Sequence, residues 1–132
     1  MHAKDSIHHP PLKKILVVDD EATIRDMMID ILDLEGYTVE VARNGQEALT
    51  KIRQAGLRSG YLVFLDIMMP VMDGYEFYRQ LSADHALRQR HVVVMMSALD
   101  HLAQAKTLEI DKILPKPFVM DDVIQIIQTY ME

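Results

Sequence analysis

Short apolar runs alternate with helical patterns along almost the whole chain, and few folds accommodate that alternation. Continuous runs at residues 15–18, 61–65 and 92–96 are largely β-branched, aromatic or otherwise apolar. Such runs are typical of strands that helices cover on both faces of a parallel sheet. Residues 37–41 alternate in polarity and residues 112–114 form a short run closed by a proline, so we expect both toward the sheet edges.

The segments between these runs repeat apolar residues at helical spacing. In the first helix these are Ile24, Met27, Met28, Ile31 and Leu32, and in the last Val123, Ile126, Ile127, Tyr130 and Met131. Asn44 and Asp73 each precede a glutamate by three residues, which indicates capped helix starts, and Gly36 indicates a helix end. A weaker pattern of apolar residues at helical spacing predicts a fourth helix over about residues 98–108. We therefore predict an α/β fold, a three-layer doubly wound (βα)5 flavodoxin-like sandwich with parallel strand order 2-1-3-4-5.

Length and composition exclude several classes of protein. A chain of 132 residues is the usual size of one domain, which we place at residues 13–132, with residues 1–12 as a disordered N-terminal extension. Without cysteines there is no thiol or disulfide chemistry, and a net charge of -6 argues against direct nucleic-acid binding. Apolar runs far shorter than the ~20 residues of a membrane span, and an opening segment unlike a signal peptide, predict no membrane association and a cytoplasmic location.

Polar residues follow four of the predicted strands at their carboxyl ends. Asp19 and Asp20 follow the first strand, Asp66 the third, Ser97 the fourth and Lys116 the fifth. Each alone has an ordinary explanation as a helix cap, a turn residue or a solvated lysine. Ligands of open parallel sheets bind at this edge, and three carboxylates gathered there would raise one another's pKa unless a cation sat among them.

Oxygen ligands, few of them from protein, favour Mg²⁺ as that cation. A carboxylate can also act as a nucleophile toward phosphorus, and an aspartyl phosphate needs cations and hydrogen-bond donors around it. Asp66, Lys116 and Ser97 could supply these parts.

Four motifs carry a resemblance to a known family: ILVVDDE (15–21), LVFLDIMMPVMDG (62–74), VVVMMSA (92–98) and LPKPF (114–118). Over roughly residues 13–131 the chain resembles the receiver domains of bacterial two-component response regulators. The resemblance implies that Asp66 is the phosphoacceptor. It also implies that Asp20, Asp66 and the backbone carbonyl of Met68 are Mg²⁺ ligands, with Asp19 as a supporting acid of the metal site.

The same resemblance gives roles to the remaining site residues and to the partners. It implies that Ser97 bonds the phosphoryl group, that Lys116 pairs with a phosphoryl oxygen and that the peptide before Pro117 is cis. A histidine kinase or phosphotransfer protein would donate the phosphoryl group, and an unknown downstream protein would read the switch. The chain would then be no conventional enzyme, its only activities being self-phosphorylation and self-dephosphorylation. A homodimer through the fourth and fifth predicted helices is a further possibility.

The chain departs from the family pattern in two places. Ile113 occupies a position where receivers commonly carry tyrosine or phenylalanine, so the usual coupling of hydroxyl and ring is absent or replaced by repacking. Glu109-Ile110 replaces a common Gly-Ala pair. Met68 and Leu99 are apolar where the family tunes hydrolytic water, which predicts slow self-hydrolysis of the phosphoryl group.

Two other functions are compatible with parts of the pattern. A haloacid-dehalogenase-like phosphohydrolase also uses an aspartate nucleophile, but Asp66-Ile67-Met68 lacks the second carboxylate of its Asp-x-Asp motif. A phosphorylation-independent receiver-like interaction module would fit the departures at Ile113 and Glu109-Ile110. The complete set of acidic site residues disfavours it. We expect His85, His91 and His101 to be solvated surface residues rather than ligands.

Overall fold

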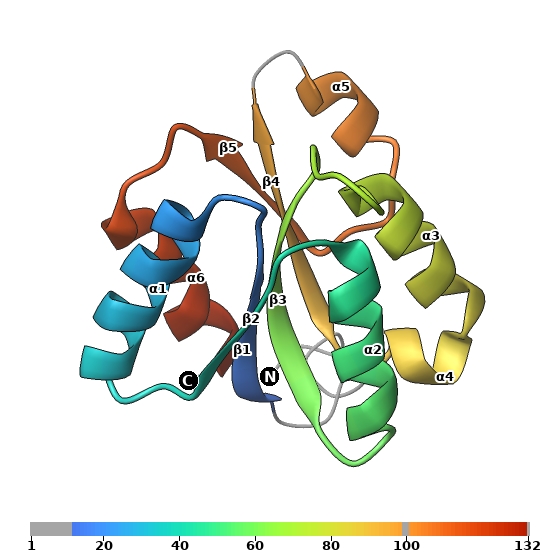
Figure 1. Ribbon diagram of the computed structural model, residues 1–132, viewed down its shortest axis with the longest axis horizontal. Coiled ribbons are helices and arrows are strands. Elements are labelled where there is room, and N and C mark those ends of the chain that lie inside the picture. Colours follow the sequence, from blue (N-terminus) through green and yellow to red (C-terminus); the bar gives the residue numbers. More distant parts are fainter. Residues whose placement is uncertain (1–11, 99–100, 132) are drawn as a thin grey trace, which may run out of the picture.

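The computed structural model describes residues 12–98 and 101–131 of the chain (Figure 1). Five parallel strands form one sheet in the order β2-β1-β3-β4-β5. The strands are β1 (Leu12–Val18), β2 (Val39–Ala42), β3 (Gly60–Asp66), β4 (Val92–Ala98) and β5 (Lys112–Lys116). The helices are α1 (Ala22–Leu34), α2 (Gly45–Ala55), α3 (Gly74–Ala83), α4 (His85–Arg88), α5 (Leu102–Ala105) and α6 (Met120–Met131). The predicted fold class and strand order are confirmed.

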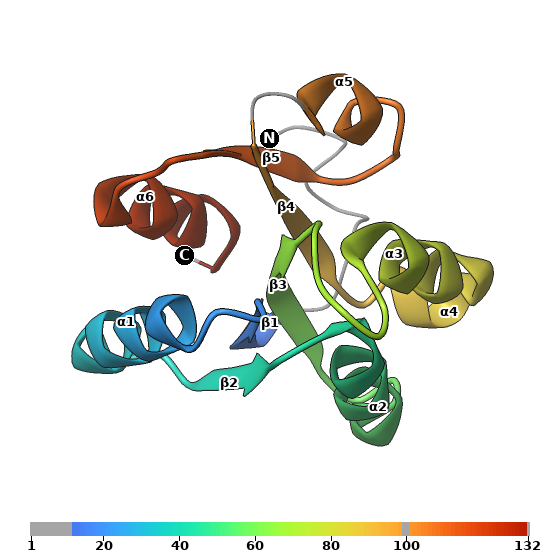
Figure 2. The ribbon, with the colours of Figure 1, turned by 45° about the horizontal axis from the view of Figure 1, so that its top comes forward.

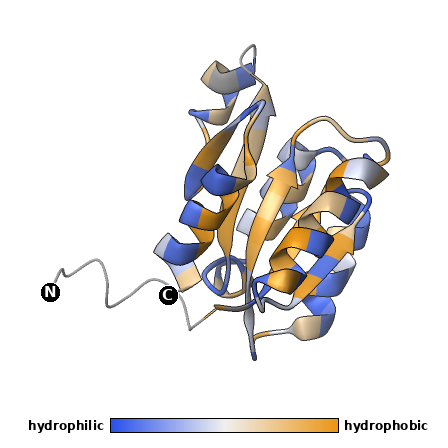
Figure 3. Ribbon diagram, turned by 90° about the vertical axis from the view of Figure 1, so that its left-hand side faces the viewer, coloured by the Kyte–Doolittle hydropathy of each residue, from blue (hydrophilic) through white to orange (hydrophobic). Residues whose placement is uncertain are grey.

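Helices cover both faces of this sheet. α1 and α6 pack on one face, and α2, α3, α4 and α5 lie on the other (Figure 2). Successive strand residues point to opposite faces, so Ile15 and Val17 contact the α1/α6 side while Leu16 and Val18 contact the α2/α3 side. The helices turn apolar residues toward the sheet and hydrophilic ones outward (Figure 3). The three central strands therefore need apolar residues at almost every position.

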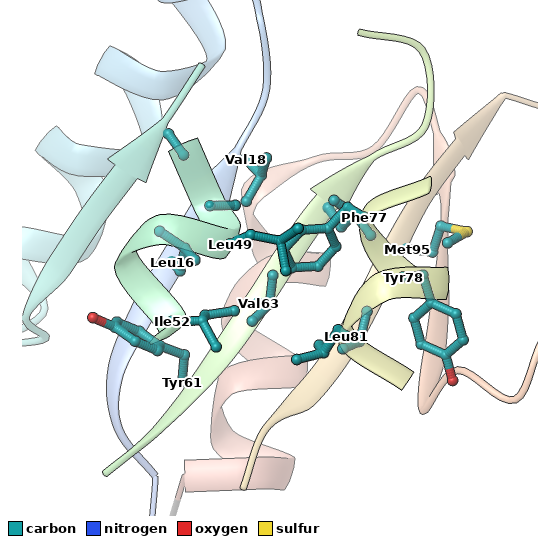
Figure 4. Packing of buried hydrophobic residues seen from close by; sticks show 14 of the residues in the cluster. Leu16, Val18, Leu49, Ile52, Tyr61, Val63, Phe77, Tyr78, Leu81 and Met95 are labelled. Atoms are coloured by element: carbon teal, nitrogen blue, oxygen red, sulfur yellow. The ribbon is translucent and has the colours of Figure 1, made fainter. Parts of the chain in front are cut away.

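The core on the α2/α3 side illustrates this packing. Leu49 of α2 and Phe77 of α3 meet Val63 of β3, and all three side chains are fully buried (Figure 4). Burial of each such side chain contributes roughly 1.5–3 kcal/mol to stability. The central strands are thereby fixed between two helical layers. Their fixed ends in turn position the loops that follow them.

The predicted helix boundaries are confirmed where the sequence carries capping residues. Asn44 and Asp73 each accept a hydrogen bond from a backbone N–H three residues on, at 3.0 and 2.9 Å. Gly36 follows α1 with φ +91°, a left-handed conformation that glycine adopts without strain.

The expected fourth helix over residues 98–108 is partly wrong. β4 continues to Ala98, because Ala98 still pairs with Lys116 at the end of β5. The helix that the structure describes after β4 is α5, and it buries Ala105 while Ala103 is exposed. Leu99 lies outside the described residues.

Two further boundaries differ from expectation. The short helix α4 was not predicted; Asp84 caps it by accepting the N–H of Leu87 at 3.1 Å. β1 begins at Leu12, which is buried, so this residue of the expected N-terminal extension is part of the sheet. Residues 1–11 of that extension lie outside the described part of the chain.

Among the helices that the structure describes, none has both the length and the apolar character needed to cross a lipid bilayer.

Candidate functional site

Three carboxylates meet at the carboxyl edge of the sheet. Asp19 directly follows β1 and Asp66 ends β3, and these two strands are neighbours in register. One carboxylate oxygen from each of Asp19, Asp20 and Asp66 lies within 4.8 Å of the others. Asp19 and Asp66 are buried, whereas Asp20 is exposed. The cluster is therefore open to solvent on the side of Asp20.

Lys116 completes the cluster from the carboxyl end of β5, an outer strand of the sheet. Its Nζ donates a hydrogen bond to Asp66 Oδ1 at 2.9 Å and lies 3.7 Å from Asp19 Oδ2. The peptide between Lys116 and Pro117 is cis, as the resemblance implied. Four of the sequence-predicted site residues are thus brought together.

Burial and charge shift the pKa values of these groups. Burial raises the pKa of Asp66, and the charge of Asp20 adds to this rise, while Lys116 opposes it. Burial also raises the pKa of Asp19, against the hydrogen bond from the backbone of Glu21. Burial alone would lower the pKa of Lys116, but its hydrogen bond to Asp66 and the charges of both aspartates hold it above the usual value. One ammonium leaves the three carboxylates with an excess of negative charge.

The donor set fits a hard divalent cation. Asp19 Oδ1 accepts the N–H of Glu21 at 2.9 Å, but its buried Oδ2 has no hydrogen-bond partner within the described residues. A buried carboxylate oxygen that accepts no hydrogen bond requires an explanation, and a cation would supply one. The cluster offers only oxygen, which Mg²⁺ prefers.

Within the described residues, no hydrogen bond joins the two remaining predicted residues to the cluster. Ser97 is buried at the end of β4, level with Pro115 of β5, and its hydroxyl donates to the carbonyl of Ala98 at 3.1 Å. Met68 lies two residues after Asp66 with its side chain 61% exposed. The role of Ser97 toward a phosphoryl group and of the Met68 carbonyl toward a metal stay predictions.

The loop from Asp66 to α3 is held by close backbone contacts. The N–H of Gly74 donates to the carbonyl of Ile67 at 2.8 Å, and a Cβ at position 74 would come within 2.5 Å of the Asp66 carbonyl oxygen. Only glycine fits at this close approach. Near the α3 end of the loop, the N–H of Gly45 also donates to the carbonyl of Met72 at 2.9 Å.

Val71 at the tip of this loop has a conformation that the sequence did not reveal. Its φ is +69°, and the N–H of Met72 donates to the carbonyl of Pro70 at 2.8 Å. An i to i+2 hydrogen bond around a positive φ forms a γ-turn that is rare and strained, above all for a β-branched residue. Position 71 carries neither the glycine nor the asparagine that would have indicated it.

The segment before β5, where Glu109 and Ile110 depart from the family pattern, is fixed by polar contacts. Tyr78 donates to the carbonyl of Glu109, and Arg88 forms an ion pair of 2.9 Å with Asp111. Asp111 also accepts the N–H of Val93 at 2.7 Å. Ile113 is partly buried against the α2/α3 side of the core.

The expectation for His91 was wrong. His91 is buried, its Nδ1 accepts the N–H of Tyr61 at 3.0 Å and its ring stacks on Tyr61. The backbone N–H at the start of β3 needs an acceptor, and a neutral imidazole provides one without burying a charge. Burial therefore lowers the pKa of His91 to about 4.

Comparison with known proteins agrees with this geometry. The family model of the response regulator receiver domain matches residues 15–128. The alkaline phosphatase synthesis transcriptional regulatory protein SphR of Synechococcus elongatus is 37% identical over 120 residues, covering 86% of this chain and 43% of SphR. The transcriptional regulatory protein ResD of Bacillus subtilis is 38% identical over 115 residues, covering 84% of this chain and 45% of ResD. The chain thus spans less than half of the length of these two relatives.

Solved structures give the same result for the fold. A CheY-like response regulator receiver domain protein from Methanospirillum hungatei matches with a TM-score of 0.75 at 27% identity, covering 89% of this chain and 93% of that one. The response regulator TrrA of Thermotoga maritima, solved in complex with Mg²⁺ and BeF, matches with a TM-score of 0.75 at 29% identity. This match covers 90% of the present chain and 99% of TrrA.

Proposed function

This chain belongs to the response regulator receiver domain family, and on that basis we propose that Asp66 accepts a phosphoryl group in a Mg²⁺-dependent reaction. The donor is the phosphohistidine of a histidine kinase or of a phosphotransfer protein. The observation that carries the proposal is the hydrogen bond of 2.9 Å between Lys116 Nζ and Asp66 Oδ1 within a cluster of carboxylates.

The chemistry follows from the groups around Asp66. A carboxylate oxygen of Asp66 forms the new bond to phosphorus, and the phosphorus–nitrogen bond breaks with its electron pair going to the imidazole of the donor. Lys116 moves from pairing with the carboxylate alone to neutralising a phosphoryl oxygen. Ser97 donates its hydroxyl to another oxygen once it leaves the carbonyl of Ala98.

Asp19, Asp20 and Asp66, with the carbonyl of Met68, are the groups we expect to hold Mg²⁺. The bound ion would neutralise negative charge on the carboxylates and on the transferred group. Asp19 would support the metal site from its buried side, because its side chain is fully buried while that of Asp20 is exposed.

The protein acts as a switch and does not turn over an external metabolite. We propose that its catalytic capacity is limited to its own phosphorylation and dephosphorylation. A phosphohydrolase is disfavoured because Ile67 and Met68 follow Asp66 and neither can protonate a leaving group.

Phosphorylation by a small donor tests the proposal. Incubation with acetyl phosphate and Mg²⁺ should add the mass of one phosphoryl group to the wild-type protein and none to Asp66→Asn. Asp73→Asn is a matched control, since asparagine also caps helices well and α3 should be retained. Labelling of Asp66→Asn, or unchanged labelling with a chelator present, would contradict the proposal.

A second candidate function is a receiver-like module that binds its partner without phosphorylation. Ile113 favours it, because an isoleucine has no ring that could follow Ser97. Beryllofluoride with Mg²⁺ distinguishes the two functions. Shifts of amide NMR signals around Ser97 and α5 support the phosphorylation switch, whereas beryllofluoride binding without such shifts supports the module.

The partners and the surroundings of the domain are proposals too. We propose that the predicted residues 13–132, together with Leu12 of β1, form the receiver domain. We also propose that it binds a downstream protein through its exposed helices, and that α5 and α6 offer a surface for a homodimer. The net charge of -6 favours protein partners over nucleic acid for this domain. A histidine kinase partner places it in the cytoplasm.

A further inference from the structure

Arg25 joins the first helix back to the acidic end of β1. It lies near the start of α1, and its guanidinium Nη1 donates a partly buried hydrogen bond of 2.8 Å to the backbone carbonyl of Asp19. Hydrogen bonds from a charged donor are stronger than those between neutral groups. The contact therefore ties the helix to the turn that carries Asp19 and Asp20.

This contact stands at the start of a helix that lacks a side-chain cap. Asn44, Asp73 and Asp84 cap α2, α3 and α4 through their side chains. Glu21 at the start of α1 makes no such bond. Two hydrogen bonds hold the turn instead: the N–H of Glu21 donates to Asp19 Oδ1, and Arg25 donates to the carbonyl of Asp19.

The position of this turn decides the geometry of the cluster. It carries two of the three carboxylates that lie within 4.8 Å of one another, and it sets the 3.7 Å between Asp19 Oδ2 and Lys116 Nζ. We propose that Arg25 is a positioning residue for Mg²⁺ binding, acting through the backbone of Asp19. This inference rests on the proposed function, because it concerns the same metal site.

Charge and positioning predict opposite effects of removing Arg25. Loss of a cation near three carboxylates should by itself tighten the binding of Mg²⁺. Loss of a contact that orients the ligands should weaken binding, by about tenfold if it resembles other outer contacts of metal sites. The direction of the change therefore separates the two effects.

The test is Mg²⁺ titration of the unphosphorylated protein, followed through the amide NMR signals of Asp20 and Glu21. We expect Arg25→Ala to bind Mg²⁺ about tenfold more weakly than the wild type. Arg25→Lys keeps the charge and one donor, so it should recover part of the loss. Amide hydrogen exchange of Glu21 without metal should be faster in Arg25→Ala, a readout that does not depend on Mg²⁺.

Arg58→Ala is the matched control, since it removes the same charge from an exposed residue beyond the amino end of β3. Its Mg²⁺ affinity should equal that of the wild type. Equal or tighter binding in Arg25→Ala, or an equal loss in Arg58→Ala, would overturn the inference. Should Arg25→Ala not fold, Arg25→Met, which removes the charge and the donor but keeps a long unbranched side chain, replaces it, and equal or tighter Mg²⁺ binding in that variant would overturn the inference. Failure of the wild type to bind Mg²⁺ would refute the proposed function itself.

Discussion

Lys116 Nζ lies 2.9 Å from Asp66 Oδ1 although the two residues belong to strands that are not neighbours. β4 lies between β3 and β5, and Ser97 of β4 is level with Pro115, one residue before Lys116. The lysine side chain therefore crosses the end of β4 to reach the aspartate.

Replacing Asp19 by asparagine should stabilise the protein without metal and weaken its response to Mg²⁺. Burial raises the pKa of Asp19, which means that the folded protein bears a cost for its charge at neutral pH. Without Mg²⁺, Asp19→Asn should raise the free energy of unfolding by about 1 kcal/mol in urea titrations. The stabilisation that Mg²⁺ gives to the wild type should be much smaller in the variant. A destabilised variant that still responds fully to Mg²⁺ would contradict this account.

The aspartyl phosphate should be long-lived in the presence of Mg²⁺. The exposed side chain of Met68 can neither accept nor donate a hydrogen bond that would orient a water for in-line attack. Met68→Asn should shorten the lifetime by about tenfold, measured as loss of the phosphorylated mass after the donor is removed. Met27→Asn, an exposed methionine of α1, serves as the control. Loss of the wild-type label within seconds would refute the prediction.

Val71→Gly should stabilise the protein. Glycine adopts a positive φ without the steric cost that valine has, and this relief exceeds the extra entropy of glycine in the unfolded chain. We expect a gain of about 1 kcal/mol in the free energy of unfolding from urea titrations. Val71→Ala keeps the Cβ and should bring little of that gain. Equal effects of the two substitutions would show that the turn is not strained by its side chain.

His91 should make the protein less stable in mild acid. Its pKa is lowered from 6.5 to about 4 by burial, with the charges of Arg88 and Arg90 adding to the effect. Above pH 6.5 the imidazole is neutral in both states. As the pH falls toward 4 the unfolded chain takes up a proton that the folded protein excludes, so up to about 3 kcal/mol of stability is lost.

Urea titrations of the wild type and of His91→Asn between pH 7 and 4 check this loss of stability. The pH range follows from the two pKa values of His91, 6.5 and about 4. The amide oxygen of asparagine can still accept the N–H of Tyr61, so the variant should fold and lose less stability over this range than the wild type. His85→Asn, at an exposed position, should behave as the wild type does. The same loss in all three proteins would assign it to other groups.

The sequence was most informative where a short pattern determines a local structure. The runs of apolar residues predicted which strands are central, and Asn44 and Asp73 predicted the starts of two helices. The positions of Asp19, Asp66 and Lys116 at strand ends predicted that their side chains meet, because parallel strands end at one edge.

The failures concern features that depend on contacts distant in sequence. His91 is buried because the backbone of Tyr61, 30 positions away, needs an acceptor. Arg25 contacts a backbone carbonyl, which no residue type indicates, and Val71 adopts its left-handed φ in a loop held by backbone hydrogen bonds. The boundary at Ala98 depends on pairing with Lys116.

The close approach of Gly74 to Asp66 has a consequence for how the domain can respond. A Cβ would come within 2.5 Å of the Asp66 carbonyl, so the backbone before α3 rests directly on that of the aspartate without an intervening side chain to absorb movement. Any displacement of the Asp66 main chain must push or pull the first turn of α3. We therefore expect the start of α3 to follow any movement of the aspartate.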